Sequence, residues 1–156
     1  MATVKLGMRP QHARVNTTVD TVAELSIGTV IDSGTIPGGE LMYIQNASGT
    51  TISEKEIGVI AEDTGKYRRA ASGTDAALQM PIAVPQLDLA QNKYYWAITK
   101  GEVTVKVDTI TAISAGHMLK IQGAGKLAKT TTAGEAVAYA LAAASAGECL
   151  VYLFGK

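Results

Sequence analysis

Residues 94–108 read Tyr94-Tyr95-Trp96-Ala97-Ile98-Thr99-Lys100-Gly101-Glu102-Val103-Thr104-Val105-Lys106-Val107-Asp108, and this stretch decides the fold class. In its second half, valines at 103, 105 and 107 alternate with polar residues, which is typical of a half-buried strand. Its first half is rich in aromatic and β-branched residues, which strands favour. Lys100-Gly101 between the halves predicts a tight turn. We therefore expect one strand over residues 94–99 and a second over residues 102–108.

Short apolar stretches separated by turn residues continue this pattern on both sides. Residues 137–144 are rich in alanine, which suits a helix, but their alternation between bounding glycines favours a strand. This spacing predicts a mostly-β fold, a compact β-sandwich or β-barrel with short strands. We expect an irregular N-terminal arm over residues 1–20 and a single β-rich domain over residues 21–156. The other expected strands cover residues 27–31, 41–45, 57–61, 82–84, 118–121 and 126–128, and a final buried strand covers residues 150–154.

Composition excludes several classes of protein. The 156 residues are 47% hydrophobic with one Phe and one Trp, so the chain can build one core from small and β-branched side chains. Fourteen basic and fourteen acidic residues cancel, which argues against a dedicated nucleic-acid binder. One cysteine, Cys149, cannot form an intramolecular disulfide. No apolar run is long enough to span a membrane, and the first residues lack a signal peptide's apolar segment, so we expect synthesis in a cytoplasm.

The charges are unevenly distributed along the chain. Residues 1–19 carry Lys5, Arg9 and Arg14 and no acidic residue, whereas residues 20–63 carry seven acidic residues besides Asp20 and a single lysine. A basic arm of this kind, which also contains Met8, could lie on a neighbouring subunit. An ordinary solvated surface with a frayed terminus explains the same pattern, and both interpretations stay open.

Motifs that would carry catalysis or metal binding are incomplete. Asp63-Thr64-Gly65 is the tripeptide of dimeric aspartic proteases, but charged residues flank it, and a polar turn after a strand explains it better. Residues 123–126 resemble a phosphate-binding loop without its closing Ser or Thr, which favours a hairpin turn. His12 and His117 lack partners at ligand spacing, and Cys149 lies in an apolar strand. We therefore predict no catalytic residue, no cofactor and no metal.

The aromatic cluster Tyr94-Tyr95-Trp96 contains the chain's single tryptophan. Aromatic residues anchor many protein interfaces. In a chain with one phenylalanine they are equally suited to fill the core, so both interpretations remain open.

Residues 80–156 show a recurring order of segments: AVPQ (83–86), LAQNKYYW (89–96), GEVTV (101–105), ISAGHML (113–119), GKL (125–127), VAYAL (137–141) and SAGE (145–148). This order resembles the head decoration, or capsid cement, proteins of tailed bacteriophages. The resemblance implies a mostly-β structural protein, commonly a homotrimer, that sits on the outer surface of the virion capsid. Its partners would be further copies of itself and the major capsid protein, with no nucleic acid and no membrane.

On this hypothesis the contacts to the capsid or to neighbouring subunits come from the basic arm and the aromatic cluster. The candidate residues are Lys5, Met8, Arg9, Arg14, Tyr94, Tyr95 and Trp96. Two alternatives belong to other classes: a tail or baseplate adhesin that binds a host-surface glycan through Tyr94 and Trp96, and a small protease built on Asp63.

Overall fold

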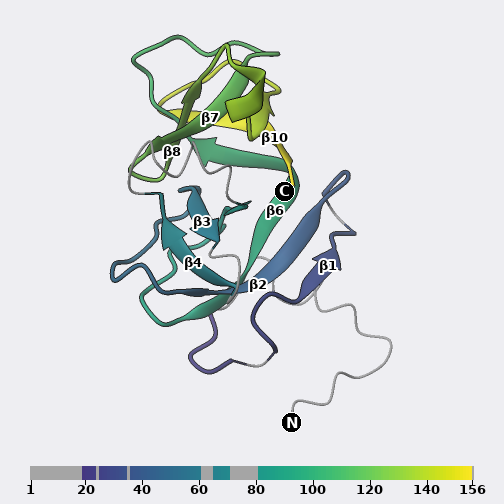
Figure 1. Ribbon diagram of the computed structural model, residues 1–156, viewed down its shortest axis with the longest axis vertical. Helices are drawn as coiled ribbons and strands as arrows, with labels where there is room; N and C mark the ends of the chain where they lie inside the picture. Colours follow the sequence, from purple (N-terminus) through teal and green to yellow (C-terminus); the bar gives the residue numbers. More distant parts are fainter. Residues whose placement is uncertain (1–18, 24, 35, 61–64, 71–80, 156) are drawn as a thin grey trace.

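The computed structural model describes residues 19–23, 25–34, 36–60, 65–70 and 81–155 (Figure 1). In these residues the chain forms one mixed sheet of ten strands and a single turn of 3₁₀ helix, so the mostly-β prediction is confirmed. The strands are β1 (Val30–Asp32), β2 (Glu40–Asn46), β3 (Gly58–Ile60), β4 (Lys66–Arg69), β5 (Ile82–Ala83), β6 (Tyr94–Lys106), β7 (Met118–Gly123), β8 (Lys126–Lys129), β9 (Ala138–Ala140) and β10 (Glu148–Phe154); the 3₁₀ turn η1 is Ala133–Glu135.

The sheet is not closed, but its two end strands come back toward β6. The strand order is β5-β3-β4-β2-β6-β10-β9-β7-β8, with β1 paired to β2. A single bridge joins Val84, just after β5, to Ile98 of β6, and another joins Leu127 of β8 to Val107, just after β6. Strand β6 therefore belongs to both halves of the molecule, the lower half with β1 to β5 and the upper half with β7 to β10 (Figure 1).

The predicted turn at residues 100–101 is wrong, because β6 runs without interruption through both residues. Gly101 has φ +98°, and a Cβ there would lie 2.7 Å from Cα of Gly39. The register with β2 also shifts by one residue beside Lys100, which marks a bulge. Glycine at this place thus lets a long strand bend between two sets of partners instead of reversing.

Most of the other expected strands form, with shifted ends. Residues 41–45, 118–121 and 126–128 lie within β2, β7 and β8, and the Gly123–Gly125 segment is the predicted hairpin turn between β7 and β8. Residues 27–31 contribute only the start of β1. The stretch at 137–144 forms strand β9 over three residues and contains no helix.

Two apolar clusters form the core. The larger runs through both halves and includes Trp96 and Ile98. It also includes the alternating valines at 103, 105 and 107, in and just after β6, which are at most 4% exposed. The smaller includes Tyr95 and Ala97 on the opposite face of β6, where Ile52 and other side chains cover them. The first half of β6 is therefore apolar on both faces, and the chain itself covers both.

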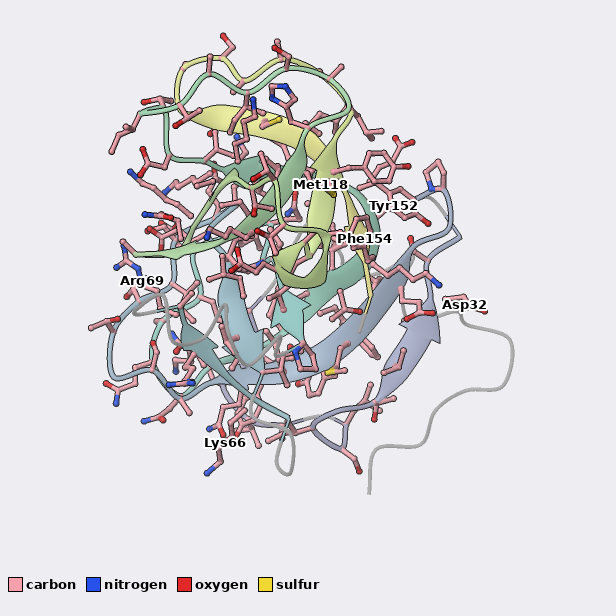
Figure 2. The ribbon with its side chains drawn as sticks, turned by 45° about the horizontal axis from the view of Figure 1, so that its top comes forward. Asp32, Lys66, Arg69, Met118, Tyr152 and Phe154 are labelled. Carbon is pink, nitrogen blue, oxygen red and sulfur yellow. The ribbon has the colours of Figure 1, made fainter. Side chains whose placement is uncertain are left out.

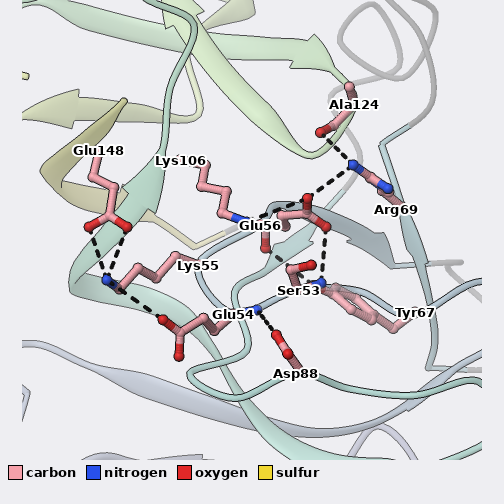
Figure 3. A network of polar contacts seen from close by, with 10 residues as sticks. All are labelled: Ser53, Glu54, Lys55, Glu56, Tyr67, Arg69, Asp88, Lys106, Ala124 and Glu148. Atoms are coloured by element: carbon pink, nitrogen blue, oxygen red, sulfur yellow. Dashed lines mark hydrogen bonds and ion pairs between the residues drawn. The ribbon is translucent and has the colours of Figure 1, made fainter. Parts of the chain in front are cut away.

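A buried carboxylate joins the two halves (Figure 3). Glu56 Oε1 lies 3.0 Å from Nη2 of Arg69 on β4 and 3.7 Å from Nζ of Lys106 on β6, and the Glu56 side chain is 7% exposed. Its other oxygen accepts a hydrogen bond from the backbone N–H of Ser53. Arg69 also donates to the carbonyl of Ala124 in the β7–β8 turn. Elements of both halves therefore meet at one charged group.

The neighbouring lysine extends this junction to the last strand. Lys55 has φ +64°, and its Nζ lies 2.9 Å from Oε2 of Glu148 on β10. The hydrogen bond to Glu148 is the main reason that the pKa of Lys55 is raised. Two consecutive side chains, Lys55 through Glu148 and Glu56 through Lys106, thus hold a loop of the lower half against β10 and β6.

Candidate interaction surface

Strand β10 is apolar on both faces. Cys149, Val151 and Leu153 point inward, are at most 2% exposed and belong to the larger cluster. Leu150, Tyr152 and Phe154 alternate with them and therefore point outward. The prediction of a buried strand is right for the inner face only, because Leu150 is 39% exposed and Tyr152 and Phe154 are half-buried.

The outward side chains continue across β9 and β7. Tyr152 is paired with Tyr139 on β9, which in turn is paired with Met118 on β7. The rings of Tyr139 and Tyr152 are stacked, with centroids 5.5 Å apart and planes 16° from parallel, and Phe154 lies tilted 5.8 Å from Tyr139. Figure 2 shows Met118, Tyr152 and Phe154 on one side of the molecule. We call these residues the aromatic face: Met118, Tyr139, Leu150, Tyr152 and Phe154.

The backing of the aromatic face is closely packed. On β9 the residues on either side of Tyr139, Ala138 and Ala140, are at most 1% exposed. The turn between β1 and β2 reaches the edge of the face, because a Cβ at Gly38, where φ is +61°, would lie 2.7 Å from Oη of Tyr152. The aromatic rings therefore lie on a closely packed part of the sheet, and the β1–β2 turn closely approaches their edge.

Charges of both signs surround the aromatic face. On the β6 side, Lys100 is paired with Phe154 and its Nζ lies 3.6 Å from Oε1 of Glu40. On the β7 side, Nζ of Lys120 lies 2.9 Å from Oε2 of Glu135. The hydrogen bond from Lys120 is the largest cause that lowers the pKa of Glu135. An apolar centre with a charged rim is the usual composition of a protein–protein interface.

The structure places the predicted aromatic cluster in the core. Tyr95 and Trp96 are 1% and 2% exposed, so their side chains are not available to another molecule in this conformation. Tyr94 is half-buried and stacks on Tyr43 at 6.1 Å, while Trp96 contacts the same ring at 5.3 Å. The burial of Trp96 also removes one of the two contacts that the adhesin alternative invokes. Lys5, Met8, Arg9 and Arg14 lie outside the described residues.

The residues considered for catalysis serve the fold where the structure describes them. His117 lies in the turn before β7, where its Nδ1 accepts a hydrogen bond from the backbone N–H of Ser114. Cys149 is buried, which raises the pKa of its thiol. Asp63 lies outside the described residues, as does His12. Within the described ranges no group of three His, Cys, Asp or Glu side chains could hold a metal ion, and no helix there is long and apolar enough to span a membrane.

No protein-family model matches the chain, and a search of curated proteins finds no match.

The aromatic face was missed by sequence reasoning, although the sequence contains a signal for it. Residues 149–154 are apolar at every position, so whichever side of the strand faces the core, the other side is also apolar. Such a strand must be covered on both faces or leave an apolar surface exposed.

Proposed function

We propose that this chain is a non-enzymatic structural protein that binds the outside of a phage capsid as a homo-oligomer and stabilises it by bridging neighbouring capsid subunits. The observation that carries the proposal is the aromatic face: adjoining apolar side chains, partly exposed, on a firm sheet with a charged rim. Exposed apolar groups gathered in this way mark surfaces that bind other macromolecules. A decoration protein acts only by binding other proteins, so a surface of this kind suits that function.

The resemblance to decoration proteins covers the same part of the chain. Residues 80–156 contain β5 to β10 and therefore the whole aromatic face. The segments that carry the resemblance include the turn before β7, the hairpin between β7 and β8, and strand β9. The sequence argument and the surface argument thus concern the same elements.

Asp20, where the basic arm joins the domain, is bound to the lower half of the molecule, away from the aromatic face. Asp20 exchanges two backbone hydrogen bonds with Tyr94, and its Oδ2 accepts a hydrogen bond of 2.8 Å from Oη of Tyr43. The purple segment that follows residue 19 lies at the lower end of Figure 1, whereas β7 and β10 lie at the upper end. The point at which the arm joins the domain therefore lies at the opposite end of the molecule from β7 and β10 (Figure 1).

An arm that joins the domain at this end suits a protein that clamps a lattice. Each copy in an oligomer would contribute one arm, so several weak capsid contacts form together and the effective concentration raises the overall affinity by about 10²–10⁴. Such a clamp opposes the outward force of packaged DNA without any chemical step.

Binding to phage heads tests the proposal. Purified protein is mixed with heads that lack it, the heads are sedimented, and the bound fraction is measured. We expect the full-length chain to sediment with the heads and to raise the temperature at which they release DNA. A variant lacking residues 1–16 should remain folded but lose binding. If the full-length chain does not bind heads, the proposed function is wrong; if the truncated chain binds equally well, only the role of the arm is wrong.

A further inference from the structure

We propose that the aromatic face is the surface through which one copy of this chain binds another copy. This inference deepens the proposed function and rests on it, since it names the surface that would join the copies of the proposed homo-oligomer. The occupant is a second copy of the same face or of its rim, not the capsid and not a small molecule.

The first argument compares two strands that are apolar on both faces. In the first half of β6 the chain covers both faces itself, with Trp96 in one cluster and Tyr95 in the other. In β10 neither cluster of the described residues includes Leu150, Tyr152 or Phe154. The chain therefore buries both faces of the first half of β6 but leaves the outer face of β10 partly exposed. An exposed apolar surface of this kind marks a site that binds another molecule.

The second argument is the charge of the rim. Lys100 and Glu40 lie on one side of the aromatic face, Lys120 and Glu135 lie on the other, and all four side chains are between 32% and 40% exposed. Each side therefore presents both signs of charge. A polyanion such as nucleic acid would meet repulsion on either side. A second copy presents the same mixture, so each lysine can face a glutamate across the contact.

The third argument concerns the residue at the centre. Tyr139 lies on a strand between β10 and β7, is in contact with the rings of Tyr152 and Phe154, and is 37% exposed. A tyrosine surrounded by other apolar groups is the typical hot spot of an interface. Because its ring lies partly outside the core, replacing it should change association much more than folding.

The test measures molar mass in solution for the full-length chain and three variants. Sedimentation equilibrium or light scattering should show that the wild type exceeds the 16.2 kDa of one chain. Tyr139→Lys should weaken self-association by at least about 30-fold, the effect of losing one hot-spot side chain. Leu150→Lys should act in the same direction. Ile110→Lys is the matched control, since Ile110 is 90% exposed and is not part of the aromatic face, and its mass should equal that of the wild type.

Each outcome decides the inference. A wild type that is monomeric at every concentration overturns it, as does a Tyr139→Lys variant that is folded by circular dichroism and keeps the wild-type mass. If Tyr139→Lys does not fold, Leu150→Lys at the edge of the face decides by the same criterion. Loss of association on deleting residues 1–16, with the aromatic face intact, would identify the arm as the occupant and also overturn it.

Head binding separates this inference from the proposed function. Copies that associate through the aromatic face but do not bind heads support the inference and refute the function. A wild type that binds heads as a monomer refutes the inference and the homo-oligomer of the proposed function, but supports the binding to the capsid. If both are right, the monomeric Tyr139→Lys variant binds heads, but with the lower affinity of a single attachment.

Discussion

Replacing Glu56 by glutamine tests what holds the two halves of the sheet together. The substitution keeps the shape of the side chain and an oxygen that can accept the Ser53 N–H. It removes the negative charge that lies 3.0 Å from Arg69 and 3.7 Å from Lys106. Two cations, from β4 and from the end of β6, then face each other around a neutral group (Figure 3). We expect the free energy of unfolding to fall.

The magnitude follows from the distances and the exposure of the cations. With an effective dielectric constant of about 20, Coulomb's law gives upper bounds of about 5.5 kcal/mol for Arg69 and about 4.5 kcal/mol for Lys106. Removing one partner from a fully buried ion pair costs about 3–5 kcal/mol. Arg69 and Lys106 have side chains 38% and 32% exposed, so water replaces part of what they lose. We therefore expect a loss of about 2–3 kcal/mol.

Urea denaturation followed by tryptophan fluorescence measures this loss, because Trp96 lies in the core. Glu54→Gln is the matched control: Glu54 is 53% exposed and 3.9 Å from Lys55, so its removal should cost less than about 0.5 kcal/mol. Glu56→Gln combined with Arg69→Gln should lose less than the sum of the single variants. A loss from Glu56→Gln no larger than that of the control would refute the role assigned to this charge.

Two further predictions concern the bend in β6 and the effect of pH on the buried side chains of Tyr95 and Cys149. Gly101→Ala should lower the free energy of unfolding by about 3 kcal/mol or more, since it combines a positive φ with a clash. Gly116→Ala is the control, because Gly116 has φ +83° and open space around it, and it should lose only about 1–2 kcal/mol. Equal losses would contradict the close approach of Gly101 to Gly39. Burial raises the pKa of Tyr95 to about 12 and also raises that of Cys149. The unfolded chain loses these protons at lower pH than the folded chain does. The contribution of the two groups to the free energy of unfolding should therefore be fully present below about pH 8.5 and be lost through pH 9–12. Urea titrations at rising pH check this, and Tyr95→Phe should reduce the fall above about pH 10.

The parts of the fold that could be predicted are those set by local pattern. The valines at 103, 105 and 107 are buried as their alternation requires, and the glycines at 123 and 125 turn the chain between β7 and β8. Each of these features is decided by a few neighbouring residues. Propensity and alternation are sufficient there because no distant segment competes with them.

The bend at Gly101 shows why a local pattern is not always sufficient. A glycine after a lysine suits a tight turn and a bulge equally, and the difference lies in what pairs with the flanking residues. Here β2 pairs with the first part of β6 and β10 pairs with the rest, so a reversal would break both ladders. These partners are about fifty residues away on either side in the sequence, and no short window contains that information.

The two apolar strands pose the same problem at the level of function. Residues 94–98 and 149–154 are both almost entirely apolar, and the aromatic residues of the first suited an interface and the core equally. The structure buries the first strand on both faces, because Ile52 and Leu89 pair beside it and help to cover it, while no described cluster covers the outer side of the second. Which apolar strand remains exposed thus depends on where loops distant in sequence return. The covering of every apolar face must therefore be known before an exposed one can be identified, and here the partly exposed one is the side of β10 that carries Tyr152 and Phe154.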